Sequence, residues 1–436
     1  MKKCLFFALA ILMPLASFAI WPFKPKAPER KKNPYAEPTR TANFKPVEKE
    51  DGVSVEHIEK LAKRGNPNAM LALGKIYYEG RAGKDVDYDK AMYWFMKAAE
   101  LGNGGAMFNI GLCYDGGTGV KQNLDKAIEW YLKAAENGIA EGQAKIIVIS
   151  ENRGDYKTAV RFLKVRADIG DALCARKLGV YILNGFGGEL TLQDAVHYLK
   201  QAASSGDVRA QVKLADCYQR GVGTERDYSE MLNWLSIASQ EGDAEAQIKL
   251  GYCYANGMGC AKNTDMAVKW YTIAAKAGYA PAQVEIGDCY ANGTGVAMDL
   301  TIAAEYYRKA AEQNDAFGLL RFSLAKRYGR GTPPDYKNSF VLMKKAADQK
   351  LPEAILYLGD FYEKGIGTNI DYFAAFRCYS DALAADVDEA NLPLGICYAE
   401  GRGTMKNLEL AKKHFVKAVS LGNAGAEDAL KKYFGN

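Results

Sequence analysis

The sequence predicts an all-α protein, a right-handed α/α superhelical solenoid of tandem helix-turn-helix repeats. Glycine, tyrosine and alanine recur about every 36 residues over most of the 436-residue chain. Within each copy, apolar residues recur three or four apart, which is the spacing of one helical face. A unit of this length cannot bury its apolar face alone, so stacked neighbours must supply a continuous core.

The first nineteen residues have the pattern of a secretory signal peptide. Lys2 and Lys3 precede an apolar run from Leu5 to Leu15, and residues 16–19 place small residues, Ser17 and Ala19, at the two positions that a signal peptidase reads. A single membrane anchor is the alternative. The apolar run is shorter than the roughly 20 residues of a spanning helix, which favours the signal peptide and a periplasmic or secreted protein.

Residues 20–50 are predicted to form a disordered linker rich in proline and lysine. Residues 22–50 contain eight basic and four acidic residues, a net charge of +4. Subtracting this charge and the two signal lysines from the chain's +5 leaves −1 for residues 51–436. A near-neutral body argues against nucleic-acid binding. The linker is expected to make at most a weak contact with an anionic surface, and a solvated spacer is the favoured interpretation.

About ten tandem repeats are predicted over residues 66–422, with a shortened copy at 139–170 and helical caps at 51–65 and 423–436. One marker position defines the register of the repeats, and from Gly179 onward it recurs every 36 residues. Its occurrences are Gly74, Gly111, Gly179, Ala215, Gly251, Gly287, Ser323, Gly359 and Gly395. Two further glycines follow the marker by six and eight residues in most copies.

Each repeat is expected to contain two short helices. The marker glycine lies inside the first helix, where glycine costs up to about 1 kcal/mol against alanine, so a recurring glycine implies close helix contact. Gly257 and Gly259 are expected to end that helix in one representative copy. The second helix should start near Asp265 and stop at Gly278. Recurring alanines such as Ala274 should interlock with bulky aromatics such as Trp270, one turn earlier.

The motif ALGKIYYEG…DYDKAMYWFMKAAELG resembles the Sel-one-like repeat family, a relative of the tetratricopeptide repeat. The double-glycine loop, the Lys-Ala start of the second helix and the closing Lys-Ala-Ala match this family over about residues 55–434. Departures are the shortened third copy, Pro333-Pro334 in the eighth and a weak last helix from Gly425 to Phe434. The resemblance implies a superhelical scaffold whose concave surface binds protein partners.

The cysteines are expected to be mainly buried small hydrophobes. Five of the eight beyond residue 20 occupy one repeat position: Cys113, Cys217, Cys253, Cys289 and Cys397. Equivalent points on neighbouring units should lie roughly 10 Å apart. Disulfide Cα atoms lie closer than about 7 Å, so these cysteines should not pair with one another. Pairing across helices, for example Cys378 with Cys397, stays open, and no paired Cys-x-x-Cys spacing indicates zinc.

Catalytic machinery is not expected. The three histidines, His57, His197 and His414, form no metal-binding motif, and His414 stands at a position expected to be core. Ser323 and Lys326 fit the Ser-x-x-Lys signature of penicillin-recognising enzymes, but its companion motifs are absent. Ser323 also replaces a packing glycine. The repeated loop glycines indicate turns, not a nucleotide site.

The sequence therefore predicts an exported repeat scaffold that binds protein partners on its concave surface, in the cell envelope or outside the cell. Binding of cell-wall or secreted polysaccharide is the alternative, and a penicillin-related hydrolase is a minor one. No catalytic, cofactor or metal residue is predicted, no stable membrane insertion is expected after signal cleavage, and the binding residues are left undetermined.

Overall fold

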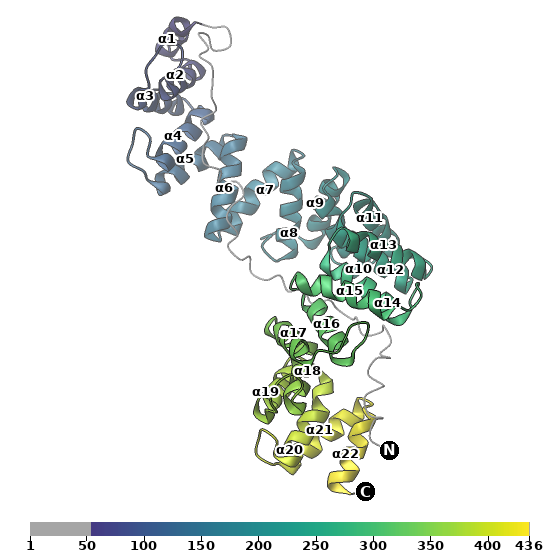
Figure 1. Ribbon diagram of the computed structural model, residues 1–436. Coiled ribbons are helices and arrows are strands. Elements are labelled where there is room, and N and C mark those ends of the chain that lie inside the picture. The colour runs from purple at the N-terminus through teal and green to yellow at the C-terminus, as the bar shows by residue number, and fades with distance from the viewer. Residues whose placement is uncertain (1–53, 436) are drawn as a thin grey trace. The chain divides into compact units, whose positions relative to one another are not determined.

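A computed structural model describes residues 54–435, and within that range it contains helices and no strand (Figure 1). The predicted fold class, an all-α solenoid of tandem helix pairs, is confirmed. The predicted signal peptide, the linker and residues 51–53 of the N-terminal cap lie outside the described residues. None of the described helices is long and apolar enough to cross a membrane.

The described chain divides into two compact units, with the division in the last turn of α10 and the loop that follows it. The N-terminal helices are α1 (Val55–Lys63), α2 (Pro67–Glu79), α3 (Tyr88–Glu100), α4 (Gly104–Gly116), α5 (Leu124–Glu136), α6 (Ala140–Arg153), α7 (Tyr156–Asp168), α8 (Ala172–Leu183), α9 (Leu192–Ser204) and α10 (Val208–Arg220). The C-terminal helices are α11 (Tyr228–Gln240), α12 (Ala244–Asn256), α13 (Thr264–Lys276), α14 (Ala280–Asn292), α15 (Leu300–Glu312), α16 (Ala316–Tyr328), α17 (Tyr336–Asp348), α18 (Pro352–Lys364), α19 (Tyr372–Ala384), α20 (Asn391–Glu400), α21 (Leu408–Ser420) and α22 (Ala424–Phe434).

From α2 to α21 the even-numbered helix is the first of each repeat and the odd-numbered helix is the second. A short 3₁₀ turn, Asp388–Ala390, precedes α20. Residues 139–170 form a full helix pair, α6 and α7, of ordinary helix length. This copy is shorter than the others because the loop between its two helices is short. Helix α6 ends at Arg153 and α7 begins at Tyr156, with Gly154 in the left-handed conformation between them.

Nine of the ten second helices begin at an asparagine or aspartate cap and α9 begins at Thr191, a feature that the repeat pattern alone did not indicate. In α13 the Asn263 side chain accepts the N–H of Met266, so the helix starts within two residues of the expected Asp265. The backbone N–H of Asn263 also donates to the carbonyl of Tyr254 over 2.7 Å. The cap therefore satisfies a free N–H group of the helix and ties the loop back to the first helix.

The marker glycines receive an aromatic ring in most repeats, which confirms the predicted close contact between helices. A Cβ built on Gly251 would lie 2.5 Å from Tyr271 Cε1, and one on Gly287 would lie 2.5 Å from Tyr307 Cε1. The expected position of the interlocking ring was wrong by one residue. Trp270 is only half-buried, whereas Tyr271 is 4% exposed and enters the core, because it lies on the helix face that points at the glycine.

The two loop glycines have different roles. Gly257 has φ 71° and ends α12 as its left-handed cap, as expected. Gly259 also has positive φ, but its Cβ would lie 2.5 Å from the carbonyl oxygen of Tyr228 in the preceding repeat. The second glycine thus allows neighbouring repeats to approach, rather than ending a helix.

The seam between repeats uses small residues and buried glutamines. The recurring alanines of the second helices, such as Ala274 and Ala310, are fully buried. A Cβ on Gly318 of α16 would lie 2.5 Å from the Ala310 methyl of the preceding repeat. Gln247 on α12 donates its Nε2 to the carbonyl of Ser239 over 3.1 Å, and Gln143, Gln211 and Gln283 make the equivalent bond. These bonds satisfy carbonyls at the end of each preceding helix.

Candidate functional site

Ser323, the one candidate nucleophile, is a packing residue. It is fully buried, and its hydroxyl donates to the Ser339 carbonyl over 2.6 Å, while Ser339 Oγ donates to the Ser323 carbonyl over 2.7 Å. The hydroxyl fits here because Met343 stands where other repeats place the large ring. Lys326 extends over the Phe322 ring, and its Nζ lies 4.0 Å from Asp335. The Ser-x-x-Lys match therefore reflects helix packing.

The three histidines lie on different helices and form no shared site. His57 on α1 and His197 on α9 are exposed. His414 on α21, expected in the core, is half-buried and stacks on Tyr398, with its Nδ1 3.0 Å from Asn391 Oδ1. Burial lowers the pKa of His414, which favours its neutral form. Within residues 54–435 no three histidine, cysteine or acidic side chains are placed to hold a metal.

All eight described cysteines are free thiols, including Cys378 and Cys397, whose pairing the sequence had left open. The five that share a repeat position are buried, as expected. Burial raises the pKa of Cys113 to about 11 and that of Cys253 to about 12. Because the thiolate is the reactive form, these cysteines are poor nucleophiles and poor metal ligands.

A linked group recurs that joins a tyrosine of the second helix, a carboxylate of the first helix and a cation of the following repeat. Tyr307 donates its hydroxyl proton to Asp288 over 2.5 Å, and Arg321 of the next repeat lies 3.1 Å from the same carboxylate. Burial and the Asp288 charge both raise the pKa of Tyr307. Equivalent groups are Tyr131–Asp115–Lys145 and Tyr379–Glu363–Arg402. Each group connects the core ring of one repeat to a charged side chain of the following repeat.

The partly exposed face of the first helices, which we call the first-helix face, is the candidate binding surface. It comprises four positions in each first helix: six residues before the marker, two residues before it, one residue after it and five residues after it. These positions are three or four residues apart and therefore share one side of the helix. Its chemistry changes from repeat to repeat. The position two residues before the marker holds Lys177, Lys213, Lys249, Glu285, Arg321 and Tyr357 in successive repeats.

Glu285 is the most perturbed acid on this face. It is half-buried on α14, and no hydrogen bond or ion pair of its carboxylate is found within residues 54–435. Burial raises the pKa of Glu285 to about 7, the nearby Asp288 charge adds to the rise, and Arg321 opposes it. The carboxyl group is therefore half-protonated near neutral pH and has unused hydrogen-bonding capacity.

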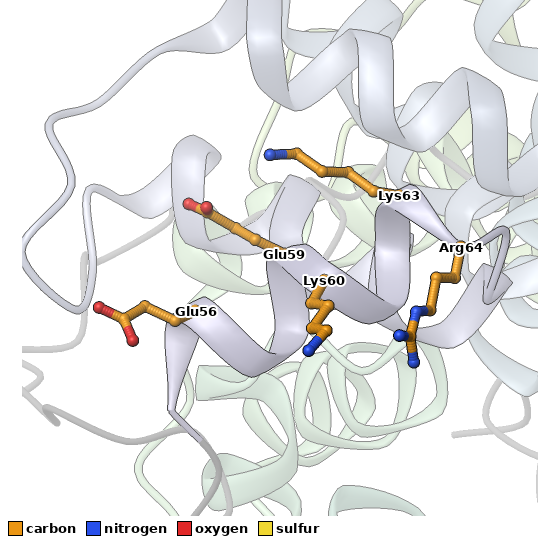
Figure 2. Close-up of a pocket in the computed structure, with 5 residues that line it drawn as sticks. All are labelled: Glu56, Glu59, Lys60, Lys63 and Arg64. Carbon is orange, nitrogen blue, oxygen red and sulfur yellow. The ribbon is translucent and has the colours of Figure 1, made fainter.

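The surface hollows of the described part of the chain include the two that follow. One lies among Glu56, Glu59, Lys60, Lys63 and Arg64 at α1, whose side chains diverge from a single helix, as Figure 2 shows. Its charges do not converge on a point, so it has no evident chemistry.

The other hollow, of about 380 Å³, lies between the loops after α16 and α18. Its lining residues are Arg327, Tyr328, Tyr336, Gly365, Ile366 and Gly367. The repeat pattern gave no indication of this hollow, although a cation next to an aromatic residue at the end of α16 was a readable signal.

Comparison with known protein families matches the Sel1 repeat nine times, at residues 67–103, 105–139, 172–207, 208–243, 244–279, 280–315, 321–351, 352–386 and 389–423. The chain belongs to the Sel1 repeat family. The predicted resemblance is confirmed, and the repeats of this family are protein-interaction scaffolds. Most of the atypical copy at 139–170 falls between two matches, although it folds as a helix pair.

Solved and curated relatives agree with this family. The chain is 26% identical to c5321, a protective antigen of uropathogenic Escherichia coli with an SLR fold, with a TM-score of 0.62 over 87% of this chain and 91% of that one. It is 34% identical over 89 residues to HRD3A, an ERAD-associated E3 ubiquitin-protein ligase component of Arabidopsis thaliana. It is 42% identical over 45 residues to protein sel-1 homolog 2 of Mus musculus. These matches cover 19% and 10% of this chain but only 13% and 6% of the curated relatives.

Proposed function

We propose that this Sel1 repeat protein is an exported scaffold that binds protein partners on a concave surface lined by its first helices, in the cell envelope or outside the cell. The observation that carries the proposal is the contrast between core and exposed positions along the repeats. Marker, ring and alanine positions keep the same chemistry in most copies, whereas the first-helix face carries lysine, glutamate, arginine or tyrosine at one position. A surface that differs in each repeat can distinguish one partner from another.

The contacts of the C-terminal unit support a concave side on the first helices. There α12 contacts α14, α14 contacts α16, and α20 contacts α22, while no comparable contact joins successive second helices among the described residues. First helices that crowd together while second helices spread apart produce curvature with the first helices on the inside. The first-helix face would then line the groove that a partner enters.

The family supports protein as the class of partner. HRD3A is named as a component of a ubiquitin ligase, which is an assembly of proteins. Because this chain spans 13% of HRD3A, a similar role here is inferred only for the repeats. Polysaccharide binding remains the alternative, since exposed tyrosines such as Tyr328 and Tyr336 could stack on sugar rings. The packing role of Ser323 gives a hydrolase no support.

Affinity capture would test the proposal. The full chain, expressed with a C-terminal tag and its own N-terminus, would be recovered from the envelope and culture medium after cross-linking, and co-purified material analysed by mass spectrometry. A stoichiometric protein that is cross-linked to residues of the first helices supports the proposal. Recovery of glycan without such a protein, or cross-links confined to the second helices, contradicts it.

Export has its own test. The N-terminal residues of the recovered chain would be sequenced, and cleavage after Ala19 is the expected result. A chain that retains residues 1–19 and stays with the cytoplasmic fraction would refute export while leaving protein binding open.

A further inference from the structure

One repeat in the C-terminal unit has an unusual charge. Residues 316–351, which form α16 and α17, contain eight basic and two acidic residues, a net charge of +6. The repeats on either side, residues 280–315 and 352–387, each contain two basic and six acidic residues, a net charge of −4. A strongly basic repeat therefore lies between two acidic ones in a body whose total charge is −1.

Only some of these cations serve to join the repeats. Arg321 pairs with Asp288 of the preceding repeat over 3.1 Å, and Arg327 pairs with Asp360 of the following repeat over 2.6 Å. Five exposed cations have no ion-pair partner among residues 54–435. They are Arg330, Lys337, Lys344, Lys345 and Lys350. The interfaces between repeats thus leave positive charge available to another molecule.

The hollow after α16 lies beside two of these cations. Tyr328 and Tyr336, two of its walls, are 46% and 57% exposed. Arg330 lies 5.3 Å from the centre of the Tyr328 ring, and Lys337 follows Tyr336 in the first turn of α17. The walls are apolar and aromatic, and the rim is cationic.

Arg327, which lines the hollow, has an unused hydrogen-bond donor. Its guanidinium lies 4.9 Å from the ring centres of both Tyr328 and Phe361, and its side chain is only 9% exposed. Nη2 is bound to Asp360, but Nη1 is buried and has no acceptor among the described residues. A buried N–H group without an acceptor is unfavourable, so an acceptor that entered the hollow, with a small movement of its walls, would satisfy it.

We propose that the hollow formed by Arg327, Tyr328, Tyr336 and residues 365–367 is a docking site for an acidic segment of a partner protein. A carboxylate of that segment would lie near Arg327, Arg330 and Lys337, and an adjacent apolar side chain would pack against the tyrosine rings and Ile366. Arginine and tyrosine are the residues that contribute most often to protein interfaces. This inference rests on the proposed function and adds a location and a chemical class of partner.

The flanking charges favour a short acidic segment over a long polyanion. A nucleic acid that extended past the basic repeat would meet repeats of net charge −4 on either side, and the repulsion would oppose binding. A protein segment can carry its acidic residues over a few positions and remain neutral elsewhere. Apolar walls also match amino-acid side chains better than a phosphate backbone.

Fluorescence anisotropy with the full chain would test the site. The probe is a fluorescein-labelled peptide, Gly-Asp-Glu-Phe-Asp-Asp-Leu-Glu-Gly, and its control has asparagine and glutamine at the acidic positions. The test variant is Arg330→Ser/Lys337→Ser, which removes two exposed charges at the rim. The matched control is Lys262→Ser/Lys269→Ser, which removes two exposed lysines, also without an ion pair in the described structure, from the repeat at 244–279 of the same unit.

The rim variant should weaken binding of the acidic peptide about tenfold or more, whereas the matched control should change it by less than about twofold. Tyr336→Ala should weaken it as well, and the neutral peptide should bind poorly to every chain. Equal losses in the two double variants would show nonspecific charge attraction and would overturn the site. Absence of binding to the acidic peptide at millimolar concentration would also overturn it.

Two further measurements distinguish a protein-docking site from a nucleic-acid site and from a surface that no partner uses. The first measurement uses a single-stranded oligonucleotide of twelve residues as the probe. If the wild-type chain binds this oligonucleotide more tightly than the acidic peptide, and the rim variant does not bind it, protein is overturned as the partner class. Capture of the same stoichiometric protein by wild type and by the rim variant would refute the site while the proposed function stands. Failure of the wild-type chain to capture any protein would instead refute the proposed function.

Discussion

The contact between a marker glycine and the facing ring makes a quantitative prediction about stability. In Gly287→Ala the new methyl carbon would lie 2.5 Å from Tyr307 Cε1, whereas ordinary contacts are 3.4–4 Å. The ring must move by about 1 Å, yet its hydroxyl is held by Asp288. Overpacking of this kind costs about 1–3 kcal/mol, and alanine returns up to about 1 kcal/mol of helix propensity. The net expectation is a loss of up to about 2 kcal/mol.

The eighth repeat supplies the compensating change. There Ser323 replaces the glycine and Met343 replaces the ring, so a larger marker residue is accepted when the ring is absent. We therefore expect Gly287→Ala and Tyr307→Met to be coupled. The double variant should be more stable than the sum of the two single effects by about 1 kcal/mol or more.

The assay is urea unfolding followed by circular dichroism, with hydrogen exchange of α14 and α15 as a local readout. The local readout is needed because long repeat arrays can unfold in parts. Gly116→Ala is the control, since that helix position is exposed and its Cβ would lie 3.3 Å from Thr118 Oγ1 alone. It should be neutral or slightly stabilising. A stabilising Gly287→Ala, or strictly additive effects in the double variant, would refute the reasoning.

Three further predictions concern the loop, the buried acid and the thiols. Gly367→Ala should lower the free energy of unfolding in urea by about 2–4 kcal/mol, because Gly367 has φ 69° and its Cβ would overlap the Tyr336 carbonyl oxygen. Gly138→Ala is the control, since Gly138 has positive φ but open space around it, and it should cost about 1 kcal/mol. Equal losses in the two variants would contradict the close approach of neighbouring repeats at Gly367. The pKa of Glu285 is raised to about 7 in the folded chain, against 4.5 for an ordinary glutamate, so between these pH values the folded chain binds a proton that the unfolded chain has released. The contribution of Glu285 to stability is therefore present below about pH 4.5 and is lost as the pH rises through 7. Glu285→Gln should therefore stabilise the chain by about 1–2 kcal/mol more at pH 8 than at pH 5, and a pH-independent difference would count against the assignment. Alkylation of the native chain, followed by mass spectrometry, should modify half-exposed Cys260 first and the five core cysteines only on unfolding; early labelling of Cys253 would be inconsistent with its burial.

The candidate site was less predictable than the fold. Repetition hides binding residues, because a search for motifs weights positions that recur, and the first-helix face is where the repeats differ. Arg327 and Tyr336 also belong to different helices, and the other wall of their hollow comes from the following repeat. The net charge of each repeat, counted from the sequence, could have pointed to residues 316–351. It could not show which of their cations form ion pairs with neighbouring repeats.

Local chemistry in the sequence by itself determined the helix pairs, the 36-residue register and the buried alanines and cysteines. Periodicity, helix-ending glycines and apolar spacing act within a few residues and are visible in the chain. The tertiary structure decided which ring meets the marker glycine, since Tyr271 rather than Trp270 faces Gly251, and it gave Gly259 its contact with Tyr228. The tertiary structure also decided that the Ser323 hydroxyl donates a hydrogen bond to the Ser339 carbonyl. These outcomes depend on how neighbouring helices are rotated and how closely they approach, which residue spacing along the chain does not specify.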